Sequence, residues 1–143
     1  MTQAMLNKLK EKFSDKKLTL ICGSYFDVPF SQEPYDAAVS VESLHHFTQA
    51  QKIPLYRKVY AALKRDGCFI LTDYFACSSE EEDYYFQELQ RLKCENGITE
   101  NAFYHYDTPL TVEHEKDALL IAGFKKVTVL QSWHATYCLR AEK

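Results

Sequence analysis

The sequence predicts an α/β fold built on a mostly parallel sheet, and two observations support this fold class. First, three short runs, 18–22, 37–41 and 68–72, are continuously apolar, as strands buried on both faces of a parallel sheet are. Second, a segment of helical length separates the second run from the third, which is the pattern of a right-handed βαβ unit. Polar residues follow all three runs, and ligands of open α/β sheets bind outside these strand ends.

The N-terminal part is expected to contain a helix and two strands. Residues 3–13 place apolar side chains on one helical face and charged side chains on the other, which predicts a helix. A strand is expected over 18–22. The loop 25–35 contains two prolines, which are incompatible with a regular helix through it. A second strand is expected over 36–41.

The middle of the chain is expected to contain two helices on either side of a strand. Residues 49–64 carry apolar side chains at the spacing of one helical face. A turn at 65–67 then leads into a strand over 68–74. Residues 79–94 show a second apolar stripe and are followed by a stretch rich in aromatic residues without clean periodicity. We interpret 79–107 as a lid over a pocket or an insertion, with a packed surface loop as the alternative for its aromatic stretch.

The C-terminal part is expected to form one helix and two antiparallel strands. Thr111 suits the N-cap of this helix, and Gly123 suits its C-terminal stop. Residues 125–132 and 136–141 alternate apolar and polar side chains, as antiparallel strands at the end of a sheet do. Because there is no internal repeat and no low-complexity segment, residues 1–143 are interpreted as a single domain.

Composition and charge argue against several function classes. The formal net charge is −3 at pH 7, whereas nucleic-acid binding proteins carry a clustered basic excess, so we expect no nucleic-acid partner. No apolar run approaches the length of a membrane span and no signal-peptide pattern is present, so we expect no membrane partner. The five cysteines include no pair with the spacing of a metal or redox motif, which favours a cytoplasmic protein.

A glycine-rich loop is missing from the sequence. The chain has four glycines, and no two of them lie close enough for a Gly-x-Gly turn. Together with the polar strand ends, this predicts a cofactor-binding domain that lacks its front end.

Four stretches stand in the order and spacing of one known family. They are CGSYFDVPF (22–30), YDAAVSVESLHHF (35–47), LKRDGCFILTDYF (63–75) and TPLTVEHEKDALLIAGFKKVTVL (108–130). Together they resemble the C-terminal two-thirds of a class I S-adenosylmethionine-dependent methyltransferase of the small-molecule, ubiquinone-biosynthesis-like type. The resemblance implies a three-layer Rossmann-like sheet, mostly parallel with a C-terminal antiparallel strand and missing its first two strands.

The resemblance also implies S-adenosylmethionine as the cofactor and assigns residues to its site. Gly23, Ser24 and Tyr25 would face the adenine, and Ser40 and Val41 would lie beside the methionine part. Where the family has an acidic residue near the adenine amino group, this chain has Ser24, whose hydroxyl accepts hydrogen bonds without a charge.

Three residues near the strand ends are candidates for a catalytic role: His45, His46 and Asp73. Either histidine could act as a general base, since histidine titrates near neutrality, but a structural role for both stays open. Asp73 could orient a loop or face the methyl acceptor. Adjacent histidines on a helical turn point to different sides, and no further ligand at suitable spacing joins them, so no metal site is expected.

The implied function is methyl transfer from S-adenosylmethionine to a small-molecule acceptor. We expect weak or no activity from this chain alone, because the backbone of the missing loop would approach the cofactor. The alternative is a non-catalytic interaction module with the same fold. Loss of two central strands would leave an apolar sheet edge that pairs with a second copy, or with the missing N-terminal segment in trans.

Overall fold

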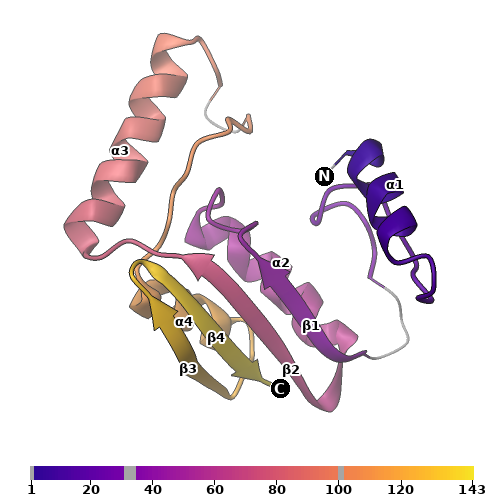
Figure 1. Cartoon of the computed structure of the whole chain (residues 1–143). Helices are drawn as coiled ribbons and strands as arrows, with labels where there is room; N and C mark the ends of the chain where they lie inside the picture. Colours follow the sequence, from indigo (N-terminus) through magenta and orange to yellow (C-terminus); the bar gives the residue numbers. More distant parts are fainter. Residues whose placement is uncertain (1, 31–34, 100–101) are drawn as a thin grey trace. The chain divides into compact units, whose positions relative to one another are not determined.

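The computed structural model describes residues 2–30, 35–99 and 102–143, and it divides the chain into two compact units. Unit 1 is Met1–Phe30 and unit 2 is Ser31–Lys143 (Figure 1). The interpretation of 1–143 as one domain stays a prediction.

Unit 1 contains one helix and no strand among its described residues. Helix α1 (Gln3–Lys12) begins at Thr2, whose hydroxyl accepts a hydrogen bond from the Met5 amide, and it forms where the sequence predicted it. The predicted strand over 18–22 is wrong, because these residues have no regular structure. An apolar run becomes a strand only when a neighbouring strand satisfies its backbone groups, and this run is not part of the sheet that the described residues form.

Unit 2 is built on a four-stranded mixed sheet. Its strands are β1 (Tyr35–Val41), β2 (Leu63–Tyr74), β3 (Lys126–Trp133) and β4 (Thr136–Glu142), in the order β1-β2-β4-β3. β1 and β2 are parallel, whereas β4 is antiparallel to both of its neighbours. Therefore β1, β2 and β3 run in one direction and β4 in the other, which confirms the predicted antiparallel C-terminal strand.

The predicted turn at 65–67 lies inside β2 instead of before it. The pairing with β1 shifts here from Leu63 to Cys68 while β1 advances only from Tyr35 to Ala37. Four residues of β2 therefore face a single residue of β1. Residues 65–67 therefore form an irregularity in the hydrogen-bonded pairing of β1 with β2. Their residue types alone do not distinguish such an irregularity from a turn outside the strand.

Two helices cover one face of this sheet. Helices α2 (Gln49–Ala62) and α4 (Val112–Ile121) lie side by side behind the strands in Figure 1. Thr111 caps α4 as predicted, and Gly123 follows the helix with a positive φ of 115°. The core lies between these helices and the sheet. Its most deeply buried side chains include Tyr56, Phe69, Leu71, Leu119 and Leu139.

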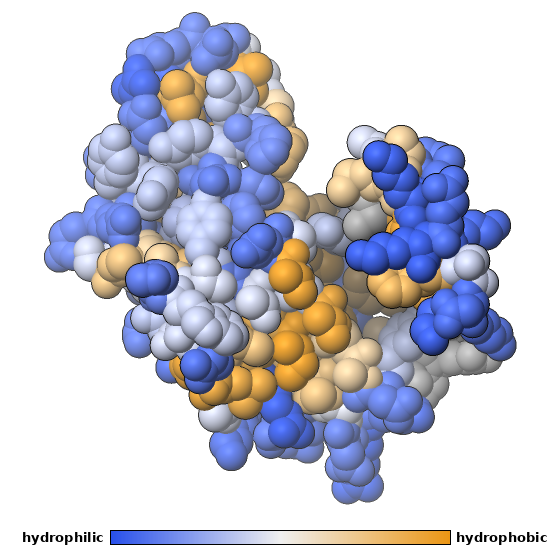
Figure 2. Space-filling view, in the orientation of Figure 1, coloured by the Kyte–Doolittle hydropathy of each residue, from blue (hydrophilic) through white to orange (hydrophobic). Residues whose placement is uncertain are grey.

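The other face of the sheet carries exposed apolar side chains. Val39 and Val41 on β1 are 67% and 59% exposed. Figure 2 shows hydrophobic atoms gathered over this part of the sheet. Helix α3 (Ser79–Glu95) extends away from the strands (Figure 1), and no helix of the described part of unit 2 covers β1 on this side. Taken by itself, unit 2 therefore has two layers.

No helix in the described ranges is both long enough and apolar enough to span a lipid bilayer.

A buried carboxylate joins α3 to α4. Glu82 is 8% exposed, and it accepts hydrogen bonds from the Thr111 amide (2.5 Å) at the start of α4 and from His114 Nδ1 (2.8 Å). The hydrogen bond with Glu82 outweighs the effect of burial and raises the pKa of His114 above its ordinary value. The protonated form of His114 is therefore favoured in the folded protein.

This pair predicts a pH dependence of stability. The stabilisation that protonated His114 gains from Glu82 is fully present below the pKa of histidine in the unfolded chain, about 6.5. It is lost as the pH rises through the raised pKa of His114 in the folded protein. Because the His114 side chain is 44% exposed and screened by solvent, we expect a change under about 1 kcal/mol between pH 6 and pH 9. Urea unfolding of wild type and His114→Gln at both pH values measures it. The variant should lack this part of the pH dependence, whereas His134→Asn, at an exposed position, should retain it.

Candidate functional site

The C-terminal ends of β1 and β2 lie at the same edge of the sheet because the two strands are parallel. The chain leaves β1 through Glu42, whose φ of 44° lies in the left-handed region that non-glycine residues rarely adopt. The Glu42 amide donates to the carbonyl of Thr72 on β2 at 2.8 Å, which holds this conformation. Such backbone strain clusters at functional sites, so the Glu42 conformation favours a functional site at this edge of the sheet.

The central feature of this edge is a buried hydrogen bond between His45 and Asp73. His45 Nδ1 lies 2.6 Å from Asp73 Oδ1, and both residues are less than a tenth exposed. The backbone amides of Leu44 (3.0 Å) and Tyr74 (3.1 Å) also donate to this carboxylate. Burial raises the pKa of Asp73, but the hydrogen bonds from His45 and the Leu44 amide outweigh it, so the pKa lies below its usual range. An ionised Asp73 requires the proton of neutral His45 on Nδ1, which leaves Nε2 as the free acceptor.

A second carboxylate approaches both histidines from a distant part of the chain. Asp107 Oδ1 lies 2.9 Å from His46 Nδ1 and 3.6 Å from His45 Nε2. The His46 contact does not have hydrogen-bond geometry, and His46 Nδ1 is buried without a hydrogen-bond partner among the described residues. Burial, followed by the repulsion of His45, lowers the pKa of His46, so this ring is neutral at neutral pH. We call His45, His46, Asp73 and Asp107 the His–Asp cluster.

The backbone next to Asp107 is fastened to His45. The Thr108 amide and hydroxyl donate to the His45 carbonyl oxygen at 2.7 and 3.3 Å, and Thr108 is fully buried. Thr108 lies 63 residues beyond His45 in the sequence. Asp107 could not be predicted as a site residue from the sequence, because no local spacing links it to the histidines.

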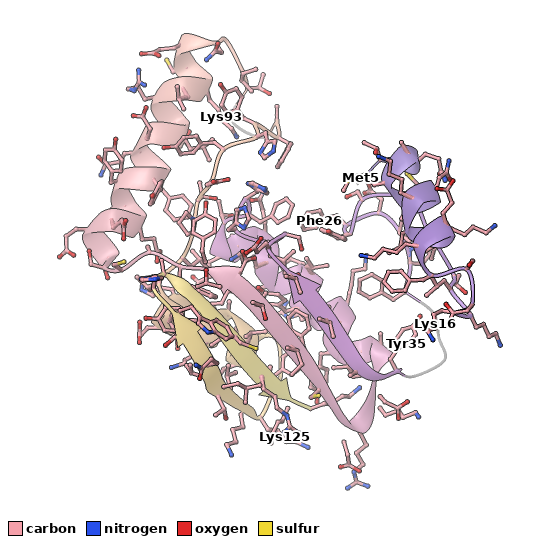
Figure 3. All side chains as sticks on the ribbon, in the orientation of Figure 1. Met5, Lys16, Phe26, Tyr35, Lys93 and Lys125 are labelled. Carbon is pink, nitrogen blue, oxygen red and sulfur yellow. The ribbon has the colours of Figure 1, made fainter. Side chains whose placement is uncertain are left out.

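A shallow hollow of about 370 Å³ opens beside the cluster. It is lined by Tyr85 from α3 and by His105, Tyr106 and Asp107 from the returning segment. The rings of Tyr85 and Tyr106 are 6.4 Å apart, so α3 and this segment are neighbours here. Lys93, labelled in Figure 3, lies on the side of α3 that faces the segment. The hollow offers aromatic surface and one carboxylate to a small ligand.

The residues expected beside the methionine part of the cofactor lie at the same edge as the cluster. Ser40 Oγ is 2.9 Å from Ser43 Oγ, and Val41 is exposed at the end of β1. Both precede the strained Glu42 turn, so the structure brings them to the strand end that also positions His45.

The residues expected at the adenine lie in unit 1, in an exposed turn. The Ser24 hydroxyl accepts a hydrogen bond from the Phe26 amide at 3.2 Å, and the Ser24 carbonyl accepts one from the Val28 amide at 3.0 Å. A Cβ at Gly23 would lie 2.2 Å from a Val28 methyl carbon, so this turn requires glycine unless Val28 moves. Tyr25 is exposed.

Comparison with known proteins identifies relatives of one kind. Residues 1–67 match the family model described as a methyltransferase domain. The chain is 27% identical to phosphoethanolamine N-methyltransferase of Plasmodium falciparum over 124 residues, which is 86% of this chain and 42% of that protein.

Solved structures of methyltransferases share the fold. An O-methyltransferase family 2 protein from Planctomyces limnophilus, solved in complex with apigenin, aligns with a TM-score of 0.69 and 20% identity over 98% of this chain and 39% of that one. Human N-acetylserotonin methyltransferase in complex with SAM aligns with a TM-score of 0.59 and 16% identity, over 85% of this chain and 32% of that one. The chain therefore spans less than half the length of each of these three proteins.

The geometry of the cluster predicts that Asp73 supports the fold as well as the site. Asp73→Asn keeps the shape of the side chain but removes the negative charge to which three hydrogen-bond donors point. We therefore expect the unfolding free energy to fall by about 1.5–3 kcal/mol. Denaturant unfolding measures this loss. Asp36→Asn is the matched control, because Asp36 on β1 makes only an exposed ion pair with Lys64 and should have little effect. Equal stability of the two variants would contradict the role assigned to Asp73.

Proposed function

Because the chain belongs to the class I S-adenosylmethionine-dependent methyltransferases, we propose that it carries the acceptor side of a site that methylates a small molecule. The observation that supports this proposal is the His45–Asp73 pair at the C-terminal edge of β1 and β2, beside the aromatic hollow. Ligands of open α/β sheets bind at such edges, and the hollow is suited to a small acceptor rather than a polymer.

The chain holds only part of the group of residues that would bind the cofactor. Ser40 and Val41 at the strand end, with Gly23, Ser24 and Tyr25 for the adenine, are the proposed contacts. No glycine-rich turn is present in the sequence to admit the rest of the molecule. S-adenosylmethionine, when bound, supplies the methyl group.

The proposed role of His45 is to receive the proton that the acceptor loses. Its Nε2 is the free acceptor atom, because Asp73 holds the proton on Nδ1. When the acceptor's nucleophilic atom takes the methyl group that S-adenosylmethionine would supply, with S-adenosylhomocysteine as the leaving group, the proton on that atom would pass to Nε2, and the Asp73 carboxylate would stabilise the imidazolium that results. For an acceptor without such a proton, His45 and His46 position the molecule, and orientation supplies much of the rate.

The complete domain is proposed to be a three-layer sheet, with 79–107 as a lid. The aromatic side chains of 79–107 that line the hollow support the lid. None of the five cysteines forms a disulfide, which fits a cytoplasmic protein.

Calorimetric titration with S-adenosylmethionine tests the proposal. Because the glycine-rich turn is missing, we expect no micromolar binding by the 143-residue chain alone. In a protein extended to the length of its relatives, binding should appear, and His45→Gln should lower kcat by about 10²–10⁴-fold while leaving cofactor affinity nearly unchanged. An extended protein that binds the cofactor with equal kcat in wild type and variant would contradict the role of His45, and micromolar binding by the short chain would contradict the expected inactivity.

The second candidate function is that of a self-associating interaction module. It is favoured by the position of β1 at the edge of the described sheet, where Val39 and Val41 of this edge strand are exposed. An apolar edge of this kind pairs readily with another strand. The proposed partner is a second copy, which gives a homodimer, or an N-terminal segment supplied in trans.

Light scattering at increasing protein concentration tests this second candidate. We expect the mass to rise toward that of a dimer, and Val39→Glu to restore the monomer by placing a charge on the associating strand. Leu120→Glu is the matched control, because Leu120 is also an exposed apolar side chain but lies on α4. A monomer at all concentrations, or equal effects of the two variants, would contradict association through β1.

A further inference from the structure

The imidazole rings of His45 and His46 lie close together beside Asp107, which the sequence did not predict. Their ring centroids are 4.0 Å apart, and one ligand atom from each of His45, His46 and Asp107 lies within 4.8 Å of the others. The expectation that the histidines point to different sides assumed a regular helical turn. The segment between β1 and α2 is instead an irregular loop, and Asp107 supplies the third ligand that local spacing did not show.

The two separations that involve Asp107 are close to those between ligands of a small divalent cation. With metal–ligand bonds of about 2.0–2.1 Å, two ligands of a tetrahedral zinc ion lie about 3.3 Å apart. Asp107 Oδ1 is 2.9 Å from His46 Nδ1 and 3.6 Å from His45 Nε2, which brackets this value. The two separations that involve Asp107 are therefore close to those of a ligand set, and the ligand atoms of the three residues all lie within 4.8 Å of one another.

The surroundings of the three atoms also suit a metal. Histidine ligands usually donate their other ring N–H to a carboxylate, and His45 does so to Asp73 at 2.6 Å. His46 Nδ1 is buried without a hydrogen-bond partner among the described residues, and a cation would satisfy it. Asp107 is 47% exposed and borders the hollow, so a cation could enter and retain an open coordination position.

We propose that His45 Nε2, His46 Nδ1 and Asp107 Oδ1 form a binding site for a divalent cation of the zinc type, with Asp73 orienting His45. Two imidazoles and one carboxylate select zinc or a neighbouring first-row metal over magnesium and calcium, which prefer oxygen ligands. The proposal goes beyond methyl transfer and does not depend on it. In the metal-loaded protein Nε2 is occupied, so His45 acts as a ligand there and not as a base.

Titration of the 143-residue chain with Co²⁺, followed by its visible absorption and by calorimetric competition with Zn²⁺, tests the site. We expect one ion per chain, weak ligand-field bands, no displacement by Mg²⁺, and no thiolate charge-transfer band in the near ultraviolet, since the proposed ligands include no sulfur. His46→Gln and Asp107→Asn should each weaken metal binding by at least about tenfold. Mutating a residue that only hydrogen-bonds a metal ligand already costs about that much affinity, and these variants remove a ligand itself.

His134→Asn is the control variant, because His134 is exposed on the β3–β4 turn at a φ of 54°, which asparagine tolerates. Its affinity should equal that of wild type. Three results would overturn the proposal. They are absence of binding, a thiolate band from the cysteines, and unchanged affinity in His46→Gln and Asp107→Asn. Because no S-adenosylmethionine is present, these outcomes test the cation site alone and do not measure methyl transfer.

Discussion

The site of this protein depends on one buried carboxylate. Asp73 is the penultimate residue of β2, and it accepts hydrogen bonds from the Leu44 amide, the Tyr74 amide and His45. Two of these donors belong to the loop after β1, so the carboxylate connects the ends of the two parallel strands. A buried charge is tolerated only when it is paired, and here the pairing itself sets the position and the tautomer of His45.

A second buried ion pair lies in the helical layer behind the site. Lys52 on α2 contacts Glu115 on α4 at 2.5 Å, and Tyr56 donates a hydrogen bond to the same carboxylate. Burial, followed by the charge of Glu115, raises the pKa of Tyr56, so the phenol stays protonated and serves as a donor. The positive charge of Lys52 also contributes to the low pKa of Asp73. The helix pair thus supplies part of the electrostatic environment of the strand ends as well as the core.

The sequence predicted the helices and strands that depend on local periodicity and capping. It did not predict features that depend on contacts between residues far apart in the chain. Helix α4 with Thr111 at its N-cap and the antiparallel pair β3–β4 follow from short-range patterns. The apolar run 18–22 forms no strand of the described sheet, and its composition alone could not reveal this. His45 and Asp73 were predicted as site residues because they follow strands. Asp107 was missed because only the folded chain brings it to the histidines.

The most direct test of this account is the protonation state of His45, read from the long-range nitrogen–proton couplings of its imidazole in NMR spectra of the metal-free chain. The account predicts that the neutral form of the ring carries its proton on Nδ1 and that this proton is strongly deshielded, as a 2.6 Å hydrogen bond to a carboxylate produces. A ring protonated on Nε2, or one that exchanges freely between tautomers, would show that Asp73 does not hold His45 and would contradict the proposed arrangement of the strand ends.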